Sequence, residues 1–136
     1  MKRLTFDDIP ALARIEEECF IEGWTADDYA VQFEVEGTSG FGIEDAGQLV
    51  AALVYTPGEG SLYVVSLGVL PTHQRQGLAT KLMTQVINLG QPVTLHVRVG
   101  NRRARALYRG LGFVDVRTEP GFYGEDGEDA ILMLRP

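Results

Sequence analysis

The chain has 136 residues, a formal net charge of −7 at pH 7 and a single cysteine, Cys19. This length suits one domain whose core needs no covalent staples, and one cysteine excludes an intrachain disulfide. The N-terminal MKRLTFDDIP lacks the apolar run of a signal peptide, and no stretch approaches the roughly 18 apolar residues of a membrane span. We therefore expect a single domain over residues 1–136 that works in the cytoplasm.

The charges are unevenly distributed along the chain. Residues 1–60 contain 13 acidic side chains, residues 61–114 contain none, and residues 115–136 contain six. The basic residues of the middle segment are Arg75, Lys81, Arg98, Arg102, Arg103, Arg105 and Arg109. A positive middle favours an anionic ligand and negative flanks favour a cationic one, but a solvated basic surface gives the same pattern.

The N-terminal part predicts a short strand over residues 1–5 and then two helices. Asp7 or Asp8 is placed to cap the first helix, over residues 9–20. Thr25 is placed to cap the second, which ends at residue 33, and an acid three residues later completes a capping box.

Three strands follow, over residues 39–45, 49–56 and 61–70, separated by the turn sequences DAGQ and PGEG. Gly68 interrupts the last of them, which is typical of a bulge or a close backbone approach.

The apolar period changes at Gly77 from that of a strand to that of a helix. Leu78, Leu82, Val86 and Leu89 recur at helical spacing until Gly90. A strand over 93–99 then alternates sharply, with His96 on its polar side. A helix capped by Asn101 and two strands, over 113–119 and 129–135, complete the chain.

The predicted order is βααβββαβαββ. Crossover helices imply parallel neighbours and tight turns imply antiparallel ones. The fold class is therefore α/β, with a mixed, twisted central sheet of about six to seven strands flanked by about four helices.

The stretch QRQGLATKLM, from Gln74 to Met83, lies between a strand and a helix. A helix start exposes unpaired N–H groups and a partial positive charge, and a glycine there lets an anion approach the backbone closely. The spacing matches neither a P-loop nor a dinucleotide fingerprint. The stretch therefore favours a pyrophosphate cradle of another kind, and a polar loop that only starts a helix is the alternative.

A second motif supports the cradle. QRQGLA, followed by LHVRVGNRRARALYRGLGF from Leu95 to Phe113, resembles the Gcn5-related N-acetyltransferase (GNAT) superfamily. The resemblance covers residues 1–136, and CFIEGW from Cys19 to Trp24 is similar to the family's acceptor loop. Among subgroups, the chain is most similar to the ribosomal-protein-alanine N-acetyltransferases, whose tail resembles FYGEDGEDAILM.

The resemblance implies a GNAT-like fold, acetyl-CoA as co-substrate, no metal, and direct attack of an amine on the thioester in a ternary complex. It implies that Tyr108 protonates the leaving thiolate. It also implies cofactor contacts from a strand backbone, from the amides of the cradle and from a helix cap: Leu67, Gly68, Val69, Arg75, Gln76, Gly77, Leu78, Ala79, Thr80 and Asn101.

His96 stands where the resembled subgroup has glutamate. An imidazole has an unperturbed pKa of about 6.5 and is suited to take a proton from an acceptor ammonium. A structural histidine paired with a buried polar group is the alternative, as is a water chain to an early acid such as Glu34 or Glu36. For Tyr108 the alternative is a core aromatic.

The acceptor class stays open between a peptide or protein N-terminal amine, including a ribosomal one, and a small amine such as a polyamine. A CoA-binding sensor without catalysis is a third reading, because His96 replaces the expected glutamate. We expect no membrane partner and no direct nucleic-acid contact. The arginines of residues 102–109 are expected to form a solvated basic face; contact with the phosphates of CoA, or with RNA if the acceptor belongs to a ribonucleoprotein, is the alternative.

Overall fold

The computed structural model describes residues 1–20, 23–124 and 126–136. Its elements confirm the predicted order and are β1 (Lys2–Arg3), α1 (Ile9–Cys19), α2 (Ala26–Phe33), β2 (Ser39–Asp45), β3 (Gln48–Pro57), β4 (Leu62–Val69), α3 (Leu78–Ile87), β5 (Val93–Arg98), α4 (Arg102–Gly110), β6 (Val114–Glu119) and β7 (Ala130–Arg135). Short 3-10 turns, Phe6–Asp8 and Pro71–His73, precede α1 and α3. Within the described ranges, no helix is long and apolar enough to cross a bilayer.

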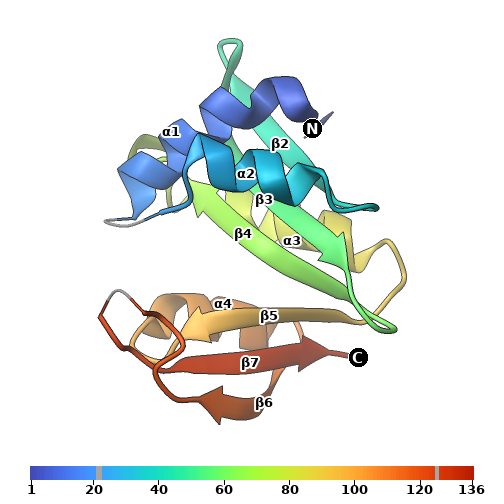
Figure 1. The fold of residues 1–136 in the computed structure, drawn as a ribbon, viewed down its shortest axis with the longest axis vertical. Coiled ribbons are helices and arrows are strands. Elements are labelled where there is room, and N and C mark those ends of the chain that lie inside the picture. The colour runs from blue at the N-terminus through green and yellow to red at the C-terminus, as the bar shows by residue number, and fades with distance from the viewer. Residues whose placement is uncertain (21–22, 125) are drawn as a thin grey trace.

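The seven strands form one sheet in the order β1-β2-β3-β4-β5-β7-β6. Only β4 and β5 are parallel neighbours, because α3 carries the chain over the sheet between them, and every other pair is antiparallel. Figure 1 shows α1 and α2 on one face of the sheet and α3 and α4 on the other. The expected mixed α/β sheet with flanking helices is confirmed.

The helix starts follow from short polar residues. Thr25 and Asp28 form the predicted capping box at α2. At α1, Asp8 occupies the predicted N-cap position, but its carboxylate makes no cap bond to α1. It accepts instead from the Thr5 N–H and from the Lys2 ammonium, each at 2.8 Å, and so closes a capping box on the 3-10 turn before α1.

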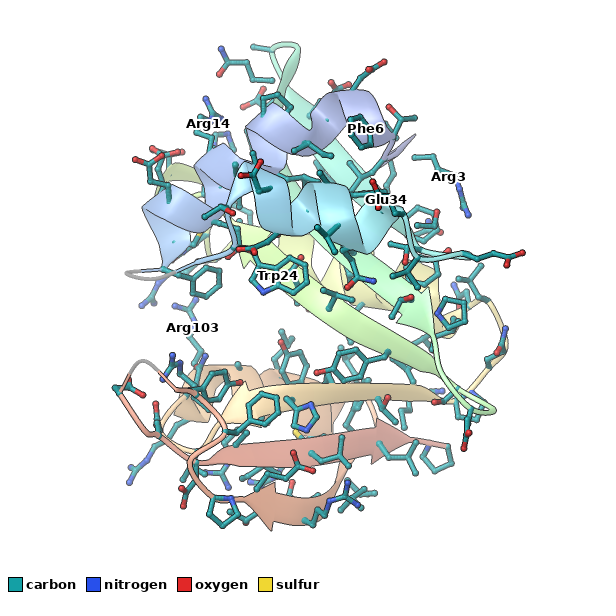
Figure 2. The ribbon with its side chains drawn as sticks, viewed as in Figure 1. Arg3, Phe6, Arg14, Trp24, Glu34 and Arg103 are labelled. Atoms are coloured by element: carbon teal, nitrogen blue, oxygen red, sulfur yellow. The ribbon has the colours of Figure 1, made fainter. Side chains whose placement is uncertain are left out.

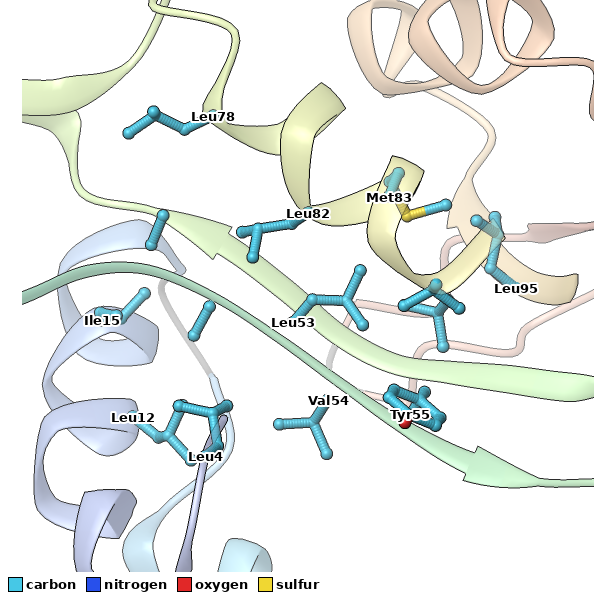
Figure 3. Close-up of a cluster of buried hydrophobic side chains, with 14 of the residues drawn as sticks. Leu4, Leu12, Ile15, Leu53, Val54, Tyr55, Leu78, Leu82, Met83 and Leu95 are labelled. Atoms are coloured by element: carbon cyan, nitrogen blue, oxygen red, sulfur yellow. The ribbon is translucent and has the colours of Figure 1, made fainter. Parts of the chain in front are cut away.

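The core lies on both faces of β3. Residues 49–55 of β3 are all buried, as expected for a strand that α1 covers on one side and α3 on the other. Figure 3 shows Leu12 and Ile15 of α1 on one side of this strand and Leu82 and Met83 of α3 on the other. Leu89 is 44% exposed because α3 ends before it, so its predicted place in the buried stripe is wrong.

The irregularity predicted in β4 lies three residues before Gly68. The β3 partners change from Val54 with Ser66 to Tyr55 with Val64, which leaves Val65 unpaired in a bulge. At Gly68 itself, the expected close approach to the backbone is confirmed. A Cβ on Gly68 would lie 2.8 Å from the Ile15 Cγ2 of α1. The glycine therefore lets α1 pack directly on the backbone of β4.

Strands β4 and β5 pair over a very short distance. Their register contains only Leu62 with Val93 and Tyr63 with Thr94, after which the strands diverge toward their carboxyl ends. Figure 1 shows the result, with β1–β4 on one side of the split and β5, β7 and β6 on the other.

Replacing Gly68 by alanine should destabilise the protein by about 1–3 kcal/mol, because the added methyl group overpacks against a buried β-branched side chain of a helix. Gly110 of α4 is the matched control, since a Cβ there meets no atom within 4 Å. Gly110→Ala should leave stability unchanged or raise it by up to about 1 kcal/mol. Urea unfolding of both variants measures the difference, and equal stabilities would contradict the packing role of Gly68.

Candidate active site

The split exposes backbone groups of β4. The Leu70 N–H donates to the Val50 carbonyl of β3 at 2.8 Å. Since peptide groups alternate in direction along a strand, those of Leu67 and Val69 point away from β3, toward the side on which β5 is no longer paired. The Val69 carbonyl accepts from the Cys19 thiol and from Gln74 Nε2, each at 3.1 Å. The remaining groups of Leu67 and Val69 form an open strand edge inside the sheet.

The N-terminus of α3 continues this edge. Gly77 is the N-cap, with a φ of 77°, and it has no side chain to cap the first turn. Arg75 also adopts a positive φ, of 65°, so the chain curls tightly before the helix. A Cβ at Gly77 would meet nothing within 4 Å, which leaves the amides of the first turn approachable. These residues therefore fit an anionic group such as a pyrophosphate.

Asn101 has the predicted capping role at α4. Its Oδ1 accepts from the Ala104 N–H at 3.1 Å. Since that oxygen is used, Asn101 has its side-chain NH₂ group to offer to a cofactor.

Tyr108 lies on α4 with its ring 5.8 Å from that of Phe113. Its hydroxyl has no hydrogen-bond partner among the residues that the structure describes. Burial, together with neighbouring Tyr123, raises the pKa of Tyr108 to about 12. The phenol is therefore protonated at neutral pH and has a proton to donate.

His96 is held from both sides. Its Nδ1 lies 2.7 Å from the Tyr63 hydroxyl and its Nε2 lies 2.9 Å from Glu119 Oε2. The Phe122 ring stacks on it at 4.2 Å, and the His96 side chain is only 15% exposed. A substrate amine therefore does not reach either ring nitrogen directly, and any proton must pass through a partner of the ring.

Tyr63 is the residue that the sequence reasoning missed. It lies on β4 opposite Thr94 of β5, so its side chain is on the face of the sheet that also carries His96. Burial, with added effects of Tyr123 and Glu119, raises the pKa of Tyr63 to about 12. The expectation of parallel strands was available from the sequence, but the register that brings Tyr63 to His96 was not.

The segment between β6 and β7 folds over the end of β5. Arg98 donates to Asp126 at 2.9 and 3.0 Å and to Glu128 at 3.1 Å, and its guanidinium lies 4.0 Å from the centre of the Tyr123 ring. Together with the stacking of Phe122 on His96, these contacts hold the segment beside the split.

Trp24 of the CFIEGW motif lies on the other side of the split (Figure 2), and residues 21 and 22 of that motif are outside the described residues. Glu16 anchors Trp24. This carboxylate is 5% exposed and accepts from the Trp24 N–H and the Tyr29 hydroxyl, while burial raises its pKa. Figure 2 shows Trp24 between α2 and the split. Phe20 is 44% exposed, and its ring lies 4.0 Å from where a Cβ on Gly68 would be.

The early acids named above lie elsewhere. Glu34 and Glu36 are exposed at the C-terminal end of α2, and Figure 2 shows Glu34 on the same side of the molecule as Arg3.

Cys19 is unsuited to carry an acetyl group, because burial and the nearby Glu16 and Glu18 raise the pKa of its thiol.

Comparisons with known proteins identify the family of the chain. The Acetyltransferase (GNAT) family model matches residues 9–113. The N-terminal acetyltransferase A complex catalytic subunit NAA10 of Arabidopsis thaliana is 32% identical over 147 aligned positions, which cover 99% of this chain and 76% of that protein. The crystal structure of the ribosomal-protein-S18-alanine N-acetyltransferase of Escherichia coli superposes with a TM-score of 0.91 at 29% identity, covering 99% and 91% of the two chains.

A shorter match has higher identity. N-alpha-acetyltransferase daf-31 of Caenorhabditis elegans is 41% identical over 97 residues, 65% of this chain and 53% of that protein. The chain thus spans about half the length of some of the curated relatives that it matches. Since the family model covers most of residues 1–136, the chain belongs to the acetyltransferase (GNAT) family.

Proposed function

We propose that residues 1–136 form one acetyl-CoA-dependent domain that acetylates the N-terminal amine of a peptide or protein. The observation that carries this proposal is the open edge of β4 in the split, which leads directly into the uncapped N-terminus of α3. A linear chain that ends in a pyrophosphate fits such a path, because amide groups pair along the edge and the anion meets the helix start. The relatives named above are N-terminal or ribosomal-protein acetyltransferases, which supports the acceptor class.

The proposed cofactor contacts follow the path. Leu67 and Val69 pair their free peptide groups with the amides of the pantetheine arm, and Gly68 keeps that stretch of β4 flat against α1. The amides of residues 75–80 hold the pyrophosphate: Arg75, Gln76, Gly77, Leu78, Ala79 and Thr80. The amide group of Asn101 contacts the cofactor from the start of α4.

The chemistry needs one proton removed from the acceptor and one delivered to the leaving group. Bound acetyl-CoA supplies the thioester carbon that the amine attacks. We assign proton removal to Tyr63 and His96 together: the Tyr63 oxygen accepts a proton from the ammonium while its own proton passes to His96 Nδ1. Tyr108 donates its phenolic proton to the departing sulfur.

The acceptor is a cationic N-terminus. The segment between α1 and α2 and the segment between β6 and β7 flank the split from its two sides, and their anchors, Glu16 and Arg98, hold them there. A ribosomal protein is one acceptor of this kind, as in the name of the Escherichia coli protein.

Turnover of acetyl-CoA with a library of N-terminal peptides, beside a panel of polyamines and amino acid derivatives, tests the proposal. Acetylation of the peptide α-amine supports it. Turnover with small amines alone would move the protein to the other acceptor class, and CoA binding without turnover on any amine would make it a sensor.

Gly77 tests the cradle. Gly77→Ala adds a Cβ at a φ of 77° and should weaken CoA binding about tenfold, because the strained residue moves the amides of the first turn. Gly90→Ala is the control at the other end of α3, with a φ of 89° and equally open surroundings. Calorimetric titration with CoA measures both. Equal affinities in the two variants would contradict the cradle.

Tyr108→Phe should lower kcat by about 10² or more, since a general acid contributes roughly 10²–10⁴-fold. The loss should be the same from pH 6 to pH 9, because a phenol with a pKa of about 12 keeps its proton throughout this range. CoA affinity should change less than about threefold. A loss that appears in the Kd for CoA and not in kcat would show that Tyr108 is a packing residue.

Tyr63→Phe and His96→Ala should change the shape of the pH profile as well as its height. Without the relay, the rate should rise only as the free α-amine loses its own proton, near pH 8. Steady-state kcat against pH for both variants, with one good peptide, measures this. If both profiles keep the native shape, the proton leaves by another route.

A further inference from the structure

The His96 ring is part of a chain of three side chains from three different strands. Tyr63 comes from β4, His96 from β5 and Glu119 from β6, linked by contacts of 2.7 and 2.9 Å. Strand β6 is not a neighbour of β5, because β7 lies between them. Glu119 therefore reaches across a whole strand to meet the imidazole.

A bulge in β6 makes this contact possible. Asp115 lies opposite Met133 of β7, but Arg117 lies opposite Leu132, so Val116 is an extra residue in the ladder. His96 also lies opposite Leu132, from the other side of β7. Without the extra residue, alternation would send Glu119 to the opposite face of the sheet.

The bulge turns two residues toward the face of His96, and they act on one another. Arg117 Nε donates to Glu119 Oε1 at 2.9 Å, which leaves Oε2 for the imidazole. The Arg117 hydrogen bond and the contact with His96 lower the pKa of Glu119. At neutral pH, Glu119 is therefore a carboxylate, and a carboxylate only accepts hydrogen bonds.

We propose that Glu119 is a positioning residue that fixes the tautomer of His96 and with it the direction of proton transfer. A carboxylate acceptor at Nε2 requires the proton on that nitrogen, so Nδ1 of the neutral ring keeps its lone pair. The Tyr63 hydroxyl then donates to Nδ1, and the Tyr63 oxygen is left as an acceptor for the substrate ammonium. The inference rests on the proposed function for its consequence, but its tautomer statement concerns the free protein.

The groups that face the His96 ring come from several elements. Tyr63 approaches from β4 and Glu119 from β6, while the apolar Phe122 covers one ring face. Further away, Arg117 is bonded to Glu119, and Arg98 at the end of β5 contacts the Tyr123 ring of the segment after β6. Glu119 is thus the one carboxylate in contact with the ring among the described residues.

Glu119→Gln is the central variant, because an amide either accepts from Nε2 or donates to it and so releases the tautomer. In kcat against pH, we expect a plateau lowered about tenfold. The KM for acetyl-CoA should stay within about twofold. Glu119→Asp keeps the carboxylate acceptor and should retain most of the native plateau.

Asp115→Asn is the matched control. Asp115 also lies on β6 and forms an ion pair, with Arg109 at 2.8 Å, but it precedes the bulge and does not contact His96. Its pH profile should equal that of the native protein. An unchanged plateau for Glu119→Gln, or the same lowered plateau for Asp115→Asn, would overturn the proposal.

Nitrogen NMR of the imidazoles gives a readout that needs no substrate. The chain has two histidines, and a His73→Gln variant assigns the signals. We expect the neutral ring of native His96 to carry its proton on Nε2, and Glu119→Gln to show a mixture of tautomers. A native proton on Nδ1 would overturn the inference. A protein with the expected tautomers but no transferase activity would instead count against the proposed function alone.

Discussion

The pairing of β4 and β5 for only two residue positions is the constraint on which the rest of the site depends. Parallel neighbours normally satisfy one another's peptide groups along their whole length, but here Leu67 and Val69 face a strand that has moved away. The fold tolerates the split because each half of the sheet is tied together by antiparallel pairs, β1 to β4 on one side and β5, β7 and β6 on the other. The open edge is therefore a property of the topology, available to a ligand that brings its own amides.

The proposed proton relay, Tyr63 with His96, lies where the pairing of β4 and β5 ends. Tyr63 is the last residue of β4 that pairs with β5. Its hydrogen bond to His96 joins the two halves of the sheet where they begin to separate. Burial keeps the Tyr63 phenol protonated, with a pKa of about 12, while the carboxylate of Glu119 lies at the other end of the chain of hydrogen bonds. In the relay that we propose, the charge of Glu119 on the outer strand β6 sets the direction of proton transfer, and the Tyr63 oxygen at the inner edge receives the proton of the substrate.

The two segments beside the split are held by charged groups on regular elements. Glu16, buried in α1, accepts from the Trp24 N–H and the Tyr29 hydroxyl and so fixes the chain after α1. Arg98, at the end of β5, binds Asp126 and Glu128 and so fixes the segment before β7. Burying a carboxylate is costly unless donors satisfy it, and both oxygens of Glu16 accept a hydrogen bond. These anchors hold the described residues of both segments by contacts within the protein itself.

The sequence alone determined the element order, the mixed sheet, the cap at Thr25 and the glycine-led start of α3, because each depends on local periodicity or on a short polar motif. It also singled out His96, through strand alternation, and Tyr108, through the resemblance to the family, as candidate reactive groups, and both roles stay predictions. Only the tertiary structure decided what His96 touches. The partners Tyr63 and Glu119 are 33 and 23 residues away, and their positions depend on the short β4–β5 register and on the bulge at Val116. A one-residue bulge reverses which side chains face the site, and its position follows from packing between strands that are distant in sequence.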